Sequence, residues 1–249
     1  MTDTASKSAP EILPLGPGGV LVRFALTPDP LAIGAAQAFC ARVQERALEG
    51  ADQIATSLAS VLVTFDPAAT QRSAVASALN ELLQEQDWSA AGLPPLRRLW
   101  TIPVSLGGES GPQISEVAEL TGRSEAQIAE DIQNTDLRVL AIGFAPGQPY
   151  FGLMPPAWDI QRQRDLTPRV PAGAVVVAVR QVIIFGQESV TGWRRIGHSA
   201  FRPFDRERPE PFALEPADGV RLAVAPHSEI AELERSGDSL GGARCEVLQ

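Results

Sequence analysis

Residues 143–152 read GFAPGQPYFG, and three glycines and two prolines stand within these ten positions. Because glycine permits positive φ angles and proline fixes its own, the stretch predicts a stiff, irregular loop. Such a loop suits the binding of a small polar ligand through its amides and the phenol of Tyr150. A tight barrel corner, with Tyr150 as a packing residue, is an equal alternative. The residues expected to frame a site are Gly143, Pro146, Gly147, Pro149 and, further along the chain, Gly192.

Short β-type runs, separated by glycine and proline clusters, surround this loop at residues 137–144, 174–178, 182–185 and 220–225. Many short strands with such punctuation are typical of a barrel or a sandwich. The AAGLPP segment at residues 90–95 has the small-residue and proline content of a linker. We therefore predict a mainly-β domain over residues 96–249.

The first 95 residues carry a different pattern. Residues 1–19 predict a tail, and residues 20–26 alternate as a half-buried strand does. Apolar residues three or four apart over residues 31–48 predict a helix, and two adjoining strands within 53–65 and a second helix follow. Strand, helix, two strands and helix pack naturally as helices over one face of a small sheet. Residues 1–95 therefore predict a small α+β domain, which holds no catalytic constellation and is expected to shape or dock.

Charge and composition exclude several classes of protein. Asp and Glu number 30 against 21 Lys and Arg, a net charge of −9. This acidity argues against nucleic-acid binding, which needs a basic face, and against docking on an anionic membrane. No apolar run approaches the ~18 residues that a membrane span needs. The two cysteines, Cys40 and Cys245, are far apart and expected to stay reduced, so a cytoplasmic location is predicted.

The sequence offers few catalytic groups. Only two histidines occur, His198 and His227, and no cluster of His, Cys or carboxylate residues has the spacing of a zinc site. We therefore expect no metal. Neither a GxSxG nucleophile elbow nor a GxxxxGK[ST] phosphate loop is present. The glycines of residues 107–111 offer amides to an anion, but a short glycine loop is a weak signal.

Two further stretches carry candidate site residues. In TPRVPAG, residues 167–173, Arg169 stands between prolines, and its restricted backbone suits a guanidinium held ready for a carboxylate or carboxamide. A surface salt bridge is as good an interpretation. In ESVTGWRRIG, residues 188–197, Trp193 could form the floor of a pocket, although core packing is its commoner role. Glu188 could accept a proton or pair with an arginine.

Taken together, these stretches resemble the family variously called KipI, 5-oxoprolinase subunit PxpB and allophanate hydrolase subunit 1, a carboxyltransferase domain of the subdomain C and D type. The resemblance covers essentially the whole chain and is strongest after residue 95. Further matching elements are GGESGP at 107–112, EVAELTG at 116–122, Gln181, and Phe204-Asp205. The resemblance implies a small α+β N-terminal domain followed by a cyclophilin-like β-barrel over residues 96–249.

The resemblance also implies an amide (lactam) hydrolase subunit that is inactive alone. It implies an obligate partner of the PxpC, or allophanate hydrolase subunit 2, type, and in the 5-oxoprolinase version a PxpA-like protein and ATP hydrolysis by the complex. No nucleotide site can be placed in this chain. The substrate-binding residues that it implies are Tyr150, Arg169, Gln181 and Trp193, with Glu188 as the catalytic acid or base. Arg169 would bind the substrate carboxylate, and Gln181 would hydrogen-bond the amide.

The chain departs from the family pattern where the family usually carries a GGQTG-like run. Here residues 179–183 read VRQVI, so only Gln181 is retained, and larger side chains fill space where a ligand or a partner backbone could approach. Gln148 also replaces an aromatic residue, and Thr191 replaces a glycine. The departures keep two alternatives open: a KipI-like regulatory inhibitor of a histidine kinase, and the carboxyltransferase half of a biotin-dependent carboxylase.

Overall fold

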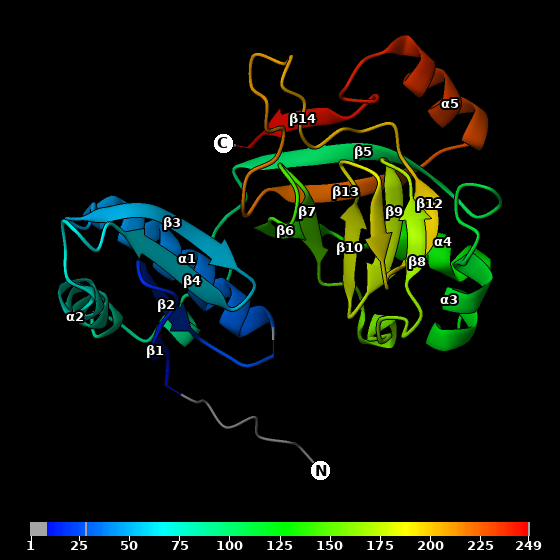
Figure 1. The fold of residues 1–249 in the computed structure, drawn as a ribbon. Coiled ribbons are helices and arrows are strands. Elements are labelled where there is room, and N and C mark those ends of the chain that lie inside the picture. The colour runs from blue at the N-terminus through cyan, green and yellow to red at the C-terminus, as the bar shows by residue number, and fades with distance from the viewer. Residues whose placement is uncertain (1–8, 28, 249) are drawn as a thin grey trace. The chain divides into compact units, whose positions relative to one another are not determined.

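The computed structural model describes residues 9–27 and 29–248. The chain divides into two compact units, Met1–Pro95 and Leu96–Gln249 (Figure 1). Each unit buries a hydrophobic core of its own, and the second also buries a smaller cluster on the outside of its sheet. That smaller cluster is the one that positions the candidate site.

The first unit is an antiparallel sheet with two helices. Its elements in chain order are β1 (Glu11–Pro14), β2 (Gly19–Arg23), α1 (Pro30–Arg46), β3 (Ala51–Ser57), β4 (Ser60–Phe65), α2 (Arg72–Leu83) and the 3-10 turn η1 (Trp88–Ala90). Its strands lie in the order β1-β2-β4-β3. The predicted first helix and the two adjoining strands are confirmed. Strand β1 lies in the segment for which the sequence predicts a tail, and it forms because its backbone pairs with β2.

Local signals explain where helix α1 begins. Asp29 accepts hydrogen bonds from the backbone N–H groups of Leu31 at 2.9 Å and Ala32 at 3.0 Å. Pro30 occupies the first turn, where a missing N–H removes no helical hydrogen bond. Residues of both helices share one core with the strands, and Phe39 at its centre is fully buried. The two helices therefore cover the same face of the sheet, as the alternation of elements predicts.

The second unit is mainly β. Its elements in chain order are β5 (Arg98–Leu106), α3 (Ile114–Thr121), α4 (Glu125–Asn134), β6 (Leu137–Ile142), β7 (Pro149–Gly152), η2 (Pro156–Trp158), β8 (Thr167–Val170), β9 (Ala174–Ala178), β10 (Gln181–Ile184), β11 (Ser189–Thr191), β12 (Arg194–His198), β13 (Gly219–Val224), α5 (His227–Ser236) and β14 (Arg244–Val247).

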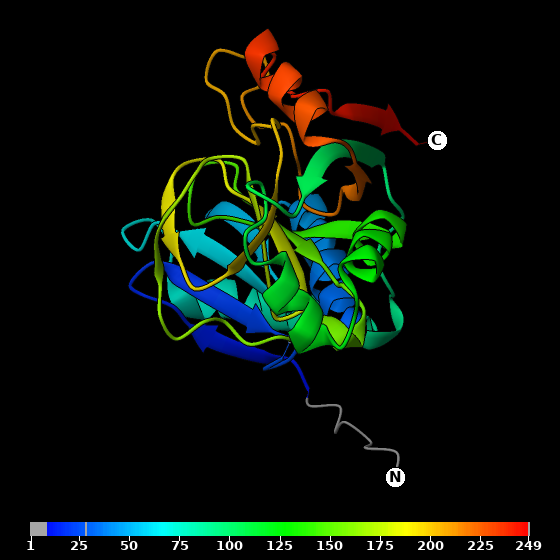
Figure 2. The same cartoon turned by 90° about the vertical axis from the view of Figure 1, so that its right-hand side faces the viewer.

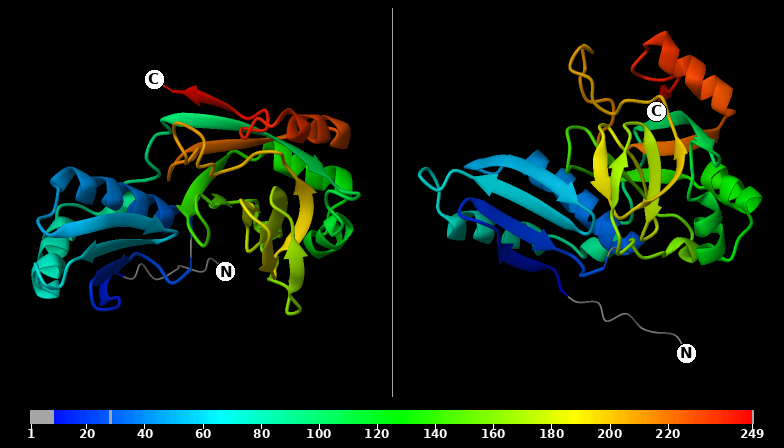
Figure 3. Two further views of the ribbon diagram at one scale, coloured as in Figure 1. Left: turned by 45° about the horizontal axis from the view of Figure 1, so that its top comes forward. Right: turned by 45° about the vertical axis from the view of Figure 1, so that its right-hand side comes forward.

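Seven of these strands close a barrel. They follow the order β6-β13-β5-β12-β9-β10-β7, and the pairing of β7 with β6 completes the ring. Strands β13 and β5 run parallel, and the other neighbours run antiparallel. Closure removes the unpaired edges that an open sheet would expose. The predicted barrel is thus confirmed, while β8 and β11 form a separate two-stranded sheet (Figure 3).

Strand β9 of the barrel buries both of its faces. In β9, Val175 and Val177 belong to the core that fills the barrel, whereas Ala174, Val176 and Ala178 belong to the smaller cluster outside it. All five residues of β9 are consequently buried. Covering on both sides explains why this strand reads as a continuous apolar run and not as an alternating one.

The helices of the second unit lie outside the barrel. Helix α3 packs against α4 and β12, and α4 packs against β13. The SEAQ segment at residues 124–127 forms the capping box that its sequence predicts: Ser124 Oγ accepts from the Gln127 N–H at 3.2 Å, and Gln127 Oε1 accepts from the Ser124 N–H at 2.9 Å. Helix α5 packs against β5 and buries Ile230, and Figure 2 shows it near β14.

Candidate functional site

Three of the predicted site residues lie on the outer side of the barrel strands β7, β10, β9 and β12. One row of paired residues runs through Tyr150, Ile183, Val176 and Arg195, and the next runs through Gly152, Gln181 and Ala178. Trp193, one residue before β12, extends the second row. The neighbouring residues along each strand face the barrel core, since side chains alternate along a strand. We call these eight residues the outer face.

Tyr150 and Trp193 contact each other at one part of the outer face. Their ring centroids are 6.1 Å apart and their planes meet at 69°, an edge-to-face arrangement. The Arg162 guanidinium lies 5.1 Å from the centroid of the Trp193 ring. Trp193 is only 5% exposed and packs in the smaller cluster with Val170. Packing is therefore what Trp193 does in this chain, and any role as a pocket wall falls to the edge of its ring and to Tyr150.

Gln181 opens strand β10 as a buried polar residue. It is 3% exposed, and its side-chain amide has no hydrogen-bond partner among the residues that the structure describes. Gly152 stands opposite it on β7, where an added Cβ would lie 3.6 Å from Gln181 Cγ. The residue is nearly buried, but its amide atoms are not sealed from solvent, so the amide remains open to a ligand, a partner or a bound water.

The turn before Gln181 is made by Val179 and Arg180, with φ values of +44° and +62°. Two successive residues at positive φ match the tight turn that joins antiparallel strands, a position that favours Asn and Gly. The Val179 N–H donates to the Ile160 carbonyl at 2.8 Å, and Arg180 Nε donates to the Met154 carbonyl at 2.8 Å. These two contacts stabilise a turn that is unfavourable for a β-branched residue. Gln181 follows directly as the first residue of β10.

Arg195 is a candidate that the sequence reasoning missed. Its neighbour Arg194 binds Glu116 at 2.7 Å, whereas Arg195 points to the opposite side and joins the row of Tyr150. The Nε of Arg195 is buried without a partner in the described chain, and burial lowers the pKa of its guanidinium. Gln113 fixes the Arg195 backbone through hydrogen bonds of 2.9 and 3.0 Å. The signal was present in the pair of arginines after Trp193, because alternation must place them on opposite sides.

Arg169 and Glu188 lie on the separate two-stranded sheet and bind each other. Arg169 Nε and Nη2 donate to Glu188 Oε1 at 3.0 and 2.8 Å, and Nη2 also donates to Oε2 at 3.1 Å. The two side chains are 78% and 54% exposed. The surface salt bridge, one of the two interpretations of Arg169, is therefore formed. A substrate carboxylate would have to displace Glu188 to reach this guanidinium, and both predicted roles stay predictions.

The loop at residues 143–149 is held by close backbone contacts. The Gly143 N–H donates to the Gln148 carbonyl at 3.0 Å, and Gly147 has a φ of +66°. A Cβ on Gly147 would lie 2.9 Å from Phe204 Cβ, so a larger residue does not fit there. The other predicted framing residues take separate places: Pro146 lies beside Gly186, Pro149 opens β7, and Gly192 packs on the carbonyl of Gln163.

Two residues of this loop are in unusual environments. Phe144 has a φ of +71° and is 74% exposed. Gln148 is 1% exposed, and its Oε1 is buried without a partner in the described chain. A large side chain at positive φ and an unpaired buried oxygen are both costly, and such costs concentrate at functional sites.

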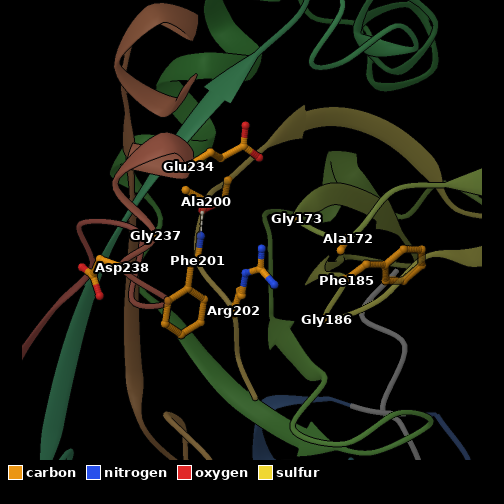
Figure 4. A pocket seen from close by; sticks show the side chains of 11 residues that line it. Ala172, Gly173, Phe185, Gly186, Ala200, Phe201, Arg202, Glu234, Gly237 and Asp238 are labelled. Carbon is orange, nitrogen blue, oxygen red and sulfur yellow. Dashed lines mark hydrogen bonds between the residues drawn. The ribbon is translucent and has the colours of Figure 1, made fainter. Parts of the chain in front are cut away.

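A hollow of about 60 Å³ lies beside the smaller hydrophobic cluster outside the barrel (Figure 4). Phe185 belongs both to that cluster and to the lining of the hollow. The lining comes from residues 172–173, 185–186 and 199–202 and from the end of α5. None of the predicted substrate-binding or catalytic residues is among them.

The described part of the chain offers no metal site, no membrane-spanning helix and no reactive thiol at Cys40. Residues 9–27 and 29–248 contain no group of three or more His, Cys, Asp or Glu side chains placed to hold a metal ion. The helices of the same residues include none with the length and apolar character of a membrane span. Cys40 is buried in α1, and burial raises its pKa to about 11. A thiol that resists ionisation is a packing residue and a poor nucleophile.

Comparison with known proteins places the chain among relatives. A family model described as "Carboxyltransferase domain, subdomain C and D" matches residues 10–214. A 5-oxoprolinase subunit of Escherichia coli O157:H7 is 35% identical over 147 residues, which are 58% of this chain and 67% of that protein. The crystal structure of TTHA0988 is 29% identical with a TM-score of 0.69, over 84% of this chain and 40% of that one. The K. lactis urea amidolyase structure is 14% identical with a TM-score of 0.75, over 98% of this chain and 17% of that one.

These similarities carry different weight. The chain spans well under half of each of the two solved structures, and the likeness to urea amidolyase shows the fold alone. The family model, by contrast, matches most of the chain, from before β1 through the outer face. The chain therefore belongs to the carboxyltransferase domain, subdomain C and D family, and it is related to proteins named as subunits of 5-oxoprolinase.

Proposed function

We propose that this chain is a subunit of an ATP-dependent hydrolase of the 5-oxoprolinase type, which opens a lactam ring. It would act only with a PxpC-like partner, and a PxpA-like protein would complete the assembly. The observation that carries the proposal is two polar groups on the outer face that have no partner among the described residues, the buried Nε of Arg195 and the amide of Gln181. We also propose that the barrel is of the cyclophilin-like type.

The chemistry of a lactam acid suits these groups. 5-Oxoproline carries a ring carbonyl, a ring N–H and a carboxylate. The Gln181 amide can donate to the carbonyl and accept from the N–H at once, and Arg195 can donate charge-assisted hydrogen bonds to an oxygen. Burial strengthens both interactions, because water no longer competes for them. The rings of Tyr150 and Trp193 would pack on the methylene groups of the lactam.

We assign the proton transfer to Glu188. Ring opening breaks the C–N bond, gives the oxygen of water to the new carboxylate, and delivers a proton to the departing nitrogen. Glu188 would move that proton once a substrate carboxylate displaces it from Arg169. Both side chains are exposed in this chain, so a partner surface would have to cover them to make a dry site. No phosphate loop occurs in the sequence, so ATP would bind elsewhere in the assembly.

Reconstitution tests the proposal. The chain is co-expressed with a PxpC-like and a PxpA-like protein, and ATP-dependent release of glutamate from 5-oxoproline is measured. We expect turnover by the complete assembly and none by this chain alone. Gln181→Leu should lower kcat/KM by about tenfold or more, because a buried polar contact is lost. Absence of turnover in the complete assembly, or full activity of both Gln181→Leu and Glu188→Gln, would refute the proposal.

A KipI-like regulatory role is the second candidate, and Phe144 favours it. An exposed aromatic side chain on a stiff loop is a typical anchor for a protein partner. The test is the autophosphorylation rate of a sensor histidine kinase with and without the chain. Inhibition that Phe144→Ala abolishes would support this role, and an unchanged rate would remove it. The carboxyltransferase half of a biotin-dependent carboxylase remains a third candidate, for which the likeness to urea amidolyase gives the fold only.

A further inference from the structure

The hollow of Figure 4 is lined by the exposed arginine Arg202. Arg202 follows β12, and its N–H donates to the Ser239 carbonyl at 2.9 Å, which fixes its backbone. Among residues 9–27 and 29–248, its guanidinium makes no hydrogen bond or ion pair, and its charge is one of the smaller causes that lower the pKa of Asp205. Five other arginines of this unit each bind a carboxylate, namely Arg98, Arg123, Arg169, Arg194 and Arg221. Figure 4 shows the Arg202 guanidinium among the lining residues, on the side of Gly173.

A carboxylate forms another part of the lining. Glu234, in the last turn of α5, accepts a hydrogen bond from His198 Nε2 at 2.6 Å through its Oε1. Its Oε2 has no partner in the described chain, and the side chain is 50% exposed. Asp238 also lines the hollow, but Figure 4 shows its carboxylate turned away, and its Oδ1 accepts from the Leu240 N–H at 3.0 Å. Within the described residues, the hollow therefore presents one guanidinium that makes no hydrogen bond and one carboxylate oxygen that accepts none.

The His198 ring fixes Glu234 while keeping one nitrogen unpaired. Nε2 binds Glu234, and Nδ1 is buried without a partner in the described residues. An unpaired buried N–H costs more than an unpaired acceptor, so the pairing favours the tautomer that carries its proton on Nε2. In that form His198 donates to Glu234 Oε1, and Oε2 stays available as an acceptor for a ligand.

The size of the hollow limits what enters it. At about 60 Å³ it is far smaller than the ~300–1,000 Å³ of a pocket that encloses a whole drug-sized ligand. Gly173 has a φ of +79°, and a Cβ there would lie 2.3 Å from the Ser199 carbonyl oxygen and 2.7 Å from His198 Cε1. Phe185 and Phe201 supply apolar walls. Room remains for a head group of a few atoms, with the rest of the ligand outside.

We infer that this hollow binds the head group of a small α-amino or α-amido acid, with its carboxylate on Arg202 and its N–H on Glu234. An arginine fork and a carboxylate are complementary in geometry and charge. A simple inorganic anion would satisfy Arg202 but would be repelled by Glu234, whereas an N–H donor next to the carboxylate satisfies both. The site shares no residue with the outer face. Only the choice of 5-oxoproline and glutamate as probes rests on the proposed function.

Calorimetric titration of the full chain without partners tests the site. Four probes separate the chemical groups: 5-oxoproline, L-glutamate, 2-pyrrolidinone, which lacks the carboxylate, and glutarate, which lacks the N–H. We expect 5-oxoproline and glutamate to bind with one site per chain, glutarate to bind more weakly, and 2-pyrrolidinone not to bind.

Matched variants place the ligand in the hollow. Arg202→Met keeps an aliphatic side chain and should weaken binding of both acids by about tenfold or more. Arg206→Met, at an arginine that is likewise exposed but does not line the hollow, should change the affinity by less than about twofold. Glu234→Gln should weaken glutamate more than 5-oxoproline, because an ammonium loses a charge partner while an amide N–H keeps an acceptor. Thermal unfolding checks that each variant is folded.

Two results would overturn the inference: no binding of either acid at millimolar concentration, or equal affinities for the native chain and Arg202→Met. Neither result bears on turnover by the assembled complex, for which the proposed residues are Gln181, Arg195 and Glu188. Conversely, binding that depends on Arg202 would stand even if the assembly does not open 5-oxoproline. The two proposals can therefore fail separately.

Discussion

The arginine on the two-stranded sheet β8–β11 and the arginine on the outer face of the barrel differ in both exposure and pairing. On the sheet, Arg169 is exposed and donates three hydrogen bonds to the carboxylate of Glu188. On the outer face, Arg195 is partly buried, and its Nε has no partner in the described chain. An exposed ion pair needs no further partner, whereas a desolvated group without a partner lowers the stability of the folded state. Burial and pairing, more than residue type, therefore identify the groups that are available to a ligand.

The largest expected effect concerns Gly173, which lines the hollow together with Phe185. Gly173→Ala should lower the free energy of unfolding by about 3 kcal/mol or more, because a Cβ there clashes with backbone and sits at positive φ. Gly143→Ala is the control, since a Cβ at Gly143 meets nothing within 4 Å. Urea denaturation measures both. Similar effects of the two changes would show that the backbone around Gly173 can move to accept a Cβ and is therefore not rigid.

Arg195→Met tests the cost of the unpaired guanidinium directly. Removing a partly buried charge that has no partner should raise the free energy of unfolding by about 1 kcal/mol, because a desolvated polar group is replaced by an apolar one. Denaturant unfolding at neutral pH measures the change. A loss of stability comparable to that of a core truncation would mean that Arg195 has a structural partner, and the contrast with Arg169 would disappear.

Val179→Gly sharpens the account of the turn that precedes Gln181. A β-branched residue at a φ of +44° costs about 1–2 kcal/mol, and the greater entropy of unfolded glycine returns part of this. We expect a net gain of about 0.5–1 kcal/mol. Val190→Gly, at an exposed position of β11, should instead destabilise. If both changes lower the melting temperature, the turn is not strained.

The smallest effect is expected at the exposed pair. Arg169→Met and Glu188→Gln should each change the free energy of unfolding by less than about 0.5 kcal/mol, since exposed ion pairs contribute little. A double-mutant cycle read from urea unfolding gives their coupling directly. A coupling above about 1 kcal/mol would show that the pair is a structural element of the sheet and would weaken its proposed role in binding.

Much of the fold follows from local sequence, and much of the site does not. Apolar spacing predicts helix α1, and glycine and proline clusters predict the short strands and the stiff loop. Closure of the ring through β6 and β7 depends on pairing that no local pattern records. The same holds for Arg194 and Arg195. Alternation separates them, but only the arrival of Glu116 from α3 decides that Arg194 is paired and Arg195 is not.

The outer-face groups that have no partner in the described chain are, on this proposal, the functional ones. The most direct test is kcat/KM for ATP-dependent 5-oxoproline opening by the reconstituted assembly carrying Arg195→Met, with Arg221→Met as the control. Arg221 is an exposed arginine that binds Asp136 on the same unit. The account predicts a loss of about a hundredfold for Arg195→Met and less than about twofold for Arg221→Met. Equal activities of the two variants would contradict it.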